Sequence, residues 1–165
     1  MKWIVLIEIY IVYSNGALAA GVCKGTWDSY EGSCYAYVND QETWAGAAEI
    51  CERLGGYLVE ITSSTENNYV KQLIRSSSAG DVWTGGNDLL GLGKWSWLNS
   101  GNRILFTDWA PGEPHGSSVT RCIQLWADDS YLWDDTPCHE ENAFVCESGP
   151  LSDGSGVTGE VPDFG

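Results

Sequence analysis

Apolar residues at helical spacing predict two helices in the first half of the chain. In Thr43–Leu54, tryptophan, alanine, cysteine and leucine side chains at positions 44, 47, 48, 51 and 54 fall on one stripe, as on the buried face of a helix. The glycines at 55 and 56 end this helix, because glycine tolerates a left-handed closing residue. A second helix is predicted over Thr65–Ile74, with Ser64 or Thr65 as its cap. Its apolar face is formed by Tyr69, Val70, Leu73 and Ile74.

The remaining apolar segments are short and predict strands. Each is rich in aromatic or β-branched residues, and turn residues bound most of them. The predicted strands are Ser33–Val38, Leu58–Ile61, Asp81–Thr84, Lys94–Leu98, Cys122–Trp126, Tyr131–Trp133 and Ala143–Glu147. The stretch between residues 85 and 116 is dense in Gly, Asn and Pro. Two helices followed by a loop-rich β half predict an α+β domain.

Both ends of the chain differ in composition from the middle. Residues 1–19 combine Lys2, an apolar run too short to span a bilayer and a small-x-small site ending at Ala19, a pattern typical of a cleaved export signal. Residues 20–147 form the predicted domain. Residues 148–165 are rich in Gly, Ser and Asp, which predicts a disordered acidic tail. An even count of six cysteines suits disulfides in a secreted, extracellular protein.

The charge of the chain narrows the choice of partners. The formal net charge is −15, a field that repels nucleic acid and anionic lipid. We therefore expect no nucleic-acid partner and no membrane insertion, and we expect cations to be attracted instead. A solvated acidic surface that serves only solubility explains the same charge.

Ordered motifs between Cys23 and Glu147 make this chain similar to a C-type lectin-like domain. The motifs are Cys34-Tyr35, Cys51, Trp83-Thr84-Gly85-Gly86, Lys94-Trp95-Ser96-Trp97, Asp108-Trp109-Ala110-Pro111-Gly112-Glu113-Pro114, Cys122, Trp133-Asp134-Asp135, Cys138 and Phe144-Val145-Cys146-Glu147. The resemblance implies two helices, short antiparallel sheets and a long irregular loop region. It also implies three disulfides, whereas the cysteine count alone permits fifteen pairings. The implied pairs are Cys23–Cys34, Cys51–Cys146 and Cys122–Cys138.

The resemblance also implies a calcium and carbohydrate site. Family members coordinate Ca²⁺ with a triplet around a cis-proline and with an Asn-Asp pair, and the sugar adds two hydroxyls. Here Glu113, Pro114 and His115 occupy the triplet, and Asp134 and Asp135 occupy the pair. Glu113, Asp134 and Asp135 are thus the expected metal ligands, His115 joins them in sugar binding, and Pro114 is expected to be cis.

Several positions depart from the family pattern. His115 offers a nitrogen that calcium binds poorly. Thr120 stands where sugar-binding members often carry Glu. Asp128 and Asp129, on a nearby predicted loop, are further candidate ligands. At a second, structural calcium site only Asp88 matches; acidic ligands are missing at Leu92, Gly116, Thr120 and Arg121, so that site is expected to be absent.

The sequence predicts a binding protein and not an enzyme. The only two histidines are His115 and His139. Asp134 and Asp135 are adjacent rather than facing each other across a cleft, as glycoside hydrolysis needs. The leading hypothesis is a secreted calcium-dependent lectin for cell-surface or microbial glycans in innate immunity. By the same resemblance, Glu113 slightly favours mannose-type sugars over galactose, whereas His115 matches neither group of sugar-binding members.

Other functions on the same fold stay open. An acidic matrix or biomineral-associated protein fits the net charge, and a calcium-independent protein-binding domain fits the departures at the site. A lectin that agglutinates needs more than one site per particle. With all six cysteines paired, such multivalency requires a non-covalent homo-oligomer.

Overall fold

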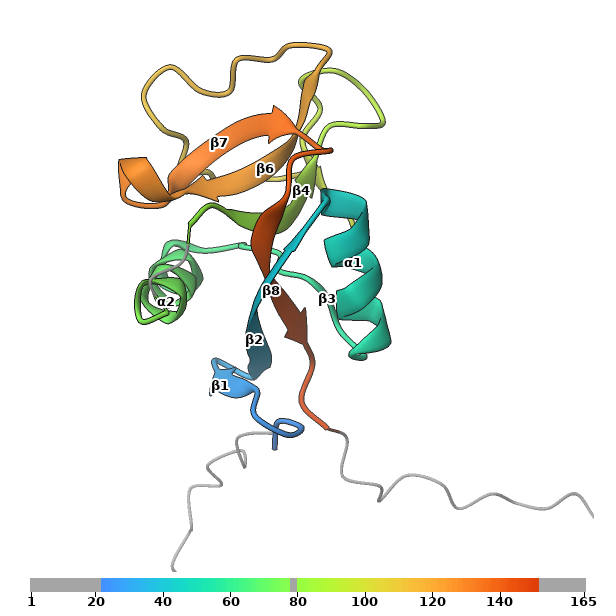
Figure 1. Cartoon of the computed structure of the whole chain (residues 1–165), viewed down its shortest axis with the longest axis vertical. Coiled ribbons are helices and arrows are strands. Elements are labelled where there is room, and N and C mark those ends of the chain that lie inside the picture. The colour runs from blue at the N-terminus through green and yellow to red at the C-terminus, as the bar shows by residue number, and fades with distance from the viewer. Residues whose placement is uncertain (1–21, 78–79, 152–165) are drawn as a thin grey trace, which may run out of the picture.

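The computed structural model describes residues 22–77 and 80–151 (Figure 1). The predicted export signal and residues 152–165 of the predicted tail lie outside the described residues. The described elements are β1 (Asp28–Tyr30), β2 (Ser33–Glu42), α1 (Trp44–Arg53), β3 (Tyr57–Leu58), α2 (Ser64–Arg75), β4 (Val82–Asn87), β5 (Ser96–Trp97), β6 (Thr120–Trp126), the 3₁₀ turn η1 (Ala127–Asp129), β7 (Leu132–Pro137) and β8 (Asn142–Ser148).

The two helices begin at hydroxyl caps. In α1 the Thr43 hydroxyl accepts a hydrogen bond from Gly46 N at 3.2 Å, at the first residue of the predicted helical segment. In α2 the cap is Ser63, whose hydroxyl accepts from Glu66 N at 3.2 Å. The predicted cap, Ser64 or Thr65, was therefore wrong. Ser63 is still extended, with φ −143° and ψ 161°, and this is the backbone conformation that a cap requires.

The strands form one mixed sheet in the order β1-β2-β8-β4-β6-β7, with β3 paired to β8 and β5 to β4. The resemblance implied short antiparallel sheets; most neighbouring strands are antiparallel, but β4 runs parallel to β8. In Figure 1 the helices flank this sheet, and the β6–β7 hairpin lies at the end opposite β1.

Some strands are shorter than predicted and others are longer. The segment predicted from Leu58 to Ile61 pairs as a strand only at β3, and β1 was not predicted. Strand β8 continues through Ser148, one residue beyond the predicted domain end, and Ser148 pairs with Cys34. Leu151 N then donates to Val22 O at 3.0 Å, so the two ends of the described chain meet.

Large aromatic side chains fill the core and fix the strand that carries the acidic pair. Trp83, Trp133 and Phe144 are fully buried. The disulfides pair as the resemblance implied: Cys51–Cys146 joins α1 to β8, Cys122–Cys138 closes the end of the β6–β7 hairpin, and Cys23–Cys34 closes the N-terminal segment. Because Trp133 is anchored in the core, the following residues of β7 project from a rigid strand.

Candidate functional site

Four predicted site residues come together in the structure. One ligand atom from each of Glu113, His115, Asp134 and Asp135 lies within 4.8 Å of the others. Glu113 and His115 come from the loop before β6, and the aspartates come from β7. Residues distant in the sequence thus form one cluster of three carboxylates and an imidazole.

The loop reaches the cluster through a sharp turn. The Glu113–Pro114 peptide bond is cis, and Glu113 N donates to Ala110 O at 3.0 Å. Ala110 N in turn donates to Trp133 O at 2.8 Å, which fixes the loop to β7. The side chains on both sides of the proline point to one place, since His115 Nδ1 lies 2.5 Å from Glu113 Oε2.

Asp135 holds the loop in position. Its side chain accepts from His115 N at 2.6 Å and from Gly116 N at 3.2 Å. It also accepts from the Thr120 hydroxyl at 2.6 Å. Only 2% of Asp135 is exposed. Thr120, which stands in the position of a family glutamate, therefore supplies a donor to the cluster and not another negative charge.

Asp134 is oriented by a chain of amides that the sequence analysis did not identify. Gln124 Nε2 donates to Asp134 Oδ2 at 2.8 Å, and Asn142 Nδ2 donates to Gln124 Oε1 at 2.8 Å. Both amide residues are buried. Asp134 Oδ1 accepts no hydrogen bond from the described residues, and it is available to a cation. In the sequence, the signal for the role of Gln124 was that it is the single polar residue in the apolar predicted strand Cys122–Trp126.

The electrostatics of the cluster favour a bound cation. Burial raises the pKa of the Glu113 carboxyl, and hydrogen bonding to Asp135 and the charge of Asp134 raise it further. Burial also raises the pKa of Asp134, although the Gln124 hydrogen bond opposes this effect. Three ionised carboxylates therefore repel one another here, and a divalent cation would relieve that repulsion.

The other candidate ligands do not join the cluster. Asp128 and Asp129 lie in η1, at the opposite end of the β6–β7 hairpin from the strand-end residue Thr120. Neither is part of a possible metal-binding group found among the described residues. The prediction that they could assist the site is therefore wrong.

Comparison with known proteins identifies the family. Residues 40–148 match the family model described as the lectin C-type domain. The chain belongs to the C-type lectin domain family. The lectin-like fold predicted from the sequence is thus confirmed, with its two helices and three disulfides.

The relatives of this lectin-like domain are described in different ways. It is 33% identical over 145 residues to Perlucin-like protein from Mytilus galloprovincialis, covering 86% of this chain and 93% of the relative. It is similar to a calcium-independent type II antifreeze protein, with 30% identity, a TM-score of 0.73 and coverage of 79% and 97%. It is also similar to the cow CD23 carbohydrate-recognition domain, solved in the presence of a GlcNAc2Man3 oligosaccharide, with 26% identity, a TM-score of 0.71 and coverage of 79% and 98%. The fold alone therefore leaves the ligand open.

In this lectin-like domain Arg121 stands beside Asp88, the one residue that matches the family's structural calcium site. Arg121 Nε donates to Asp88 Oδ1, and its terminal NH2 group donates to Asp88 O. Gly93 N donates to Asp88 Oδ2 at 2.7 Å, and the Asp88 side chain is fully buried. The guanidinium thus supplies the positive charge that Asp88 needs.

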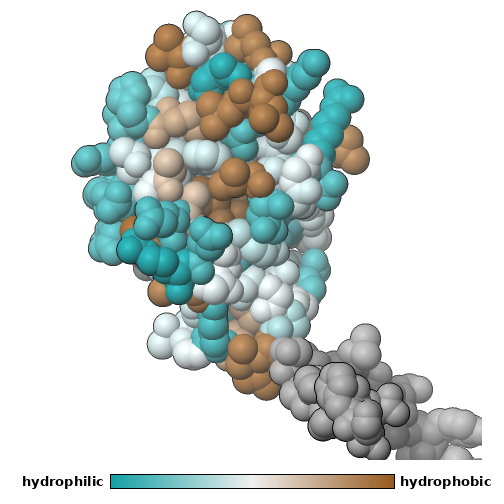
Figure 2. Space-filling model, turned by 90° about the vertical axis from the view of Figure 1, so that its right-hand side faces the viewer, coloured by the Kyte–Doolittle hydropathy of each residue, from teal (hydrophilic) through white to brown (hydrophobic). Residues whose placement is uncertain are grey.

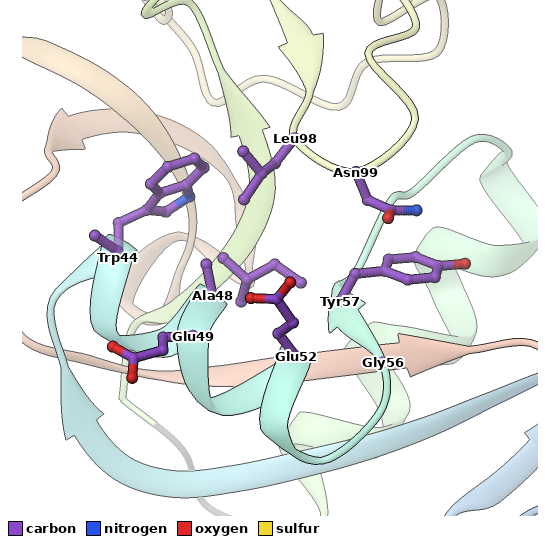
Figure 3. Close-up of a pocket in the computed structure, with 10 residues that line it drawn as sticks. Trp44, Ala48, Glu49, Glu52, Gly56, Tyr57, Leu98 and Asn99 are labelled. Carbon is purple, nitrogen blue, oxygen red and sulfur yellow. The ribbon is translucent and has the colours of Figure 1, made fainter.

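A cavity of about 580 Å³ lies apart from the acidic cluster, between α1 and the loop after β5 (Figure 3). Trp44, Ala48 and Glu52 of α1 face Leu98 and Asn99 across it in Figure 3. None of the predicted site residues lines this cavity. This cavity is therefore not the candidate calcium site.

Proposed function

We propose that this domain binds Ca²⁺ at Glu113, Asp134 and Asp135 and binds glycans through that ion. The observation that carries the proposal is the convergence of these carboxylates with His115 at the cis Glu113–Pro114 turn. The chemistry of the donors agrees, because Ca²⁺ prefers carboxylate and other oxygen ligands, six to eight in number. Three side chains leave coordination positions for sugar hydroxyls and water.

His115 would serve the sugar and not the ion. Calcium binds imidazole nitrogen poorly, and the His115 side chain is 68% exposed. A ring at the rim of the site can hydrogen-bond a sugar hydroxyl. Mannose-type sugars remain the favoured class because of Glu113, and innate recognition of microbial or cell-surface glycans remains the proposed setting.

An extracellular location is part of the same proposal. Three disulfides close the described domain, and disulfides persist in oxidising compartments. Within residues 22–77 and 80–151, no helix is both long and apolar enough to cross a membrane. Members of this family are generally binding proteins without enzymatic activity, and the proposal is accordingly a binding function.

The test is a glycan array probed in calcium and again in chelator. We expect mannose-type glycans to be bound only in calcium, and Glu113→Gln to lose this binding by about 100-fold, because it removes one of three charged ligands. Calcium should also raise the melting temperature of wild type, following RT ln(1 + [L]/Kd).

The matched control is Glu49→Gln on the exposed face of α1, which should leave glycan binding unchanged. Equal glycan signals with and without chelator would contradict the proposal. So would a melting temperature that calcium does not change.

A second prediction concerns the amide chain behind Asp134. Gln124→Leu is expected to weaken calcium binding by about 10- to 100-fold, the usual effect of removing a group that orients a metal ligand. Calcium affinity is measured by isothermal titration calorimetry, and near-ultraviolet circular dichroism confirms the fold. Gln72→Leu, on the exposed side of α2, should have no effect. An unchanged calcium affinity for Gln124→Leu would contradict the proposal that Gln124 orients Asp134 as a ligand.

One observation favours a calcium-independent alternative. The loop is already fastened to Asp135 by three protein donors, an arrangement that needs no ion. A calcium-independent antifreeze protein shares the fold. A calcium-independent protein-binding domain is therefore one alternative, and it predicts a flat response to calcium in both measurements above. An acidic matrix or mineral-associated protein is the other, and it rests on the net charge of −15.

A further inference from the structure

A groove on the long-loop half of the domain gathers two cations in a strongly acidic protein. The groove has a volume of about 480 Å³ and is lined by Lys94, Arg103, Trp95, Ser96, Leu90 and glycines. None of these residues belongs to the acidic cluster described above. Two positive side chains at one groove are notable where the net charge of the chain is −15.

The local backbone explains why both cations face the same side. Ser96 and Arg103 are antiparallel bridge partners, and Ile104 N donates to Trp95 O at 3.1 Å. Because side chains alternate along such a pair, Lys94, Ser96 and Arg103 share one face. The other face carries Trp97 and Ile104, which are buried in the core, and Trp95, which packs against that core. The cations are thus held on a rigid two-stranded support.

These two cations also differ from the others in having no partner. The chain has eight lysines and arginines, and Lys2 lies outside the described residues, which leaves seven. Five of the seven make an ion pair, a hydrogen bond or a cation–π contact: Lys24, Arg53, Lys71, Arg75 and Arg121. Lys94 and Arg103 make none of these side-chain contacts with any described residue. Their charges are therefore available to a ligand.

The rest of the groove indicates what kind of anion would fit. Leu90 is 92% exposed, and the Trp95 ring packs against Trp109 with centroids 5.1 Å apart. Figure 2 shows hydrophobic side chains exposed beside hydrophilic ones at the end of the domain that carries the long loops. A ligand with one or two anionic groups on a compact, partly apolar ring would contact both kinds of side chain. A long polyanion would be repelled by the acidic surface around the groove.

We propose that this groove is a second, calcium-independent site for an anionic saccharide. Arg103 would bind the anionic group through two parallel N–H donors, as guanidinium does with sulfate-like and carboxylate groups. Lys94 would add a point charge, and the exposed Leu90 side chain would contact the sugar ring. Sulfate and carboxylate share this chemistry, and the choice of probe separates them.

The experiment is calorimetric titration in chelator, at an ionic strength of about 0.01 M to limit screening. The probes are a chondroitin sulfate tetrasaccharide, a hyaluronan tetrasaccharide with carboxylates only, and neutral maltotetraose. We expect saturable binding of the sulfated or the carboxylated probe and none of maltotetraose. Arg103→Met should weaken binding at least 10-fold and Lys94→Met several-fold. Backbone amide shifts in a nitrogen-15 NMR spectrum should be confined to residues 90–103.

Two controls keep this site distinct from the proposed calcium site. Arg53→Met makes the same change in net charge at an exposed position of helix α1 that does not line the groove, and it should leave the affinity within about twofold. Glu113→Gln should also have no effect. Loss of binding in Arg53→Met equal to that in Arg103→Met would overturn the proposal, because net charge would then explain it. A dependence on calcium or on Glu113 would also overturn it, as would the absence of saturable binding in chelator.

Discussion

Replacing Arg121 by methionine is expected to lower the free energy of unfolding by about 3–5 kcal/mol. The substitution leaves the fully buried Asp88 carboxylate without its only ion-pair partner among the described residues. It also removes the donor to Asp88 O, which supports the loop after β4. The measurement is urea denaturation in chelator, so that no added metal can replace the lost charge.

Two further variants test the cause. Arg121→Met combined with Asp88→Asn should recover part of the lost stability, because the unpaired charge is then gone. Arg53→Met, an exposed arginine with a partner 3.8 Å away on the same helix, should cost less than about 0.5 kcal/mol. If Arg121→Met costs no more than Arg53→Met, the buried pair does not stabilise the fold.

Replacing Glu147 by glutamine is expected to remove a large pH dependence of stability. Glu147 lies in β8 with 6% exposure, and burial raises its pKa to about 7, with the Glu66 charge adding to the effect. Between the ordinary value of 4.5 and 7, the folded state binds more protons than the unfolded state. The free energy of unfolding therefore falls as pH rises through this window, by up to about 3 kcal/mol from this group.

Glutamine resembles the protonated carboxyl. It can still accept from Glu60 N, which donates to Glu147 Oε2 at 3.1 Å, and the Ser33 hydroxyl can reorient toward the new amide. We expect the variant to gain stability relative to wild type between pH 5 and 8, measured by denaturant unfolding in chelator across that range. A constant difference between the two proteins from pH 5 to 8 would show that Glu147 is ionised throughout.

Helix α1 and the acidic cluster were predictable because their signals are local or follow a family motif. The apolar stripe of α1 occupies consecutive turns of one helix. The Glu113-Pro114-His115 triplet and the Asp134-Asp135 pair each stand next to conspicuous aromatic motifs. For these residues, position in the sequence carried enough information to place them together.

The features that could not be predicted from the sequence depend on contacts between residues that are distant in the chain. The parallel pairing of β4 with β8 needs the register Val82↔Ala143, which no local pattern indicates. Gln124 acts on Asp134 only because they are opposite each other in the β6–β7 register. In the sequence, Arg121 indicated only that an acidic calcium ligand is absent at its position. In the structure it lies next to Asp88, where its positive charge takes the place of a cation. The Ser63 cap was missed by one residue, because four hydroxyl residues in succession, at positions 62 to 65, compete for that role.

The meeting of Val22 and Leu151, where backbone atoms are 3.0 Å apart, has a consequence for engineering. Both ends lie at the pole opposite the β6–β7 hairpin (Figure 1). A domain whose ends are neighbours can be spliced into a surface loop of a host protein with little strain on either partner. Inserted in this way, the domain would project from the surface of the host. Its long loops would point away from the host, and both candidate sites would stay accessible.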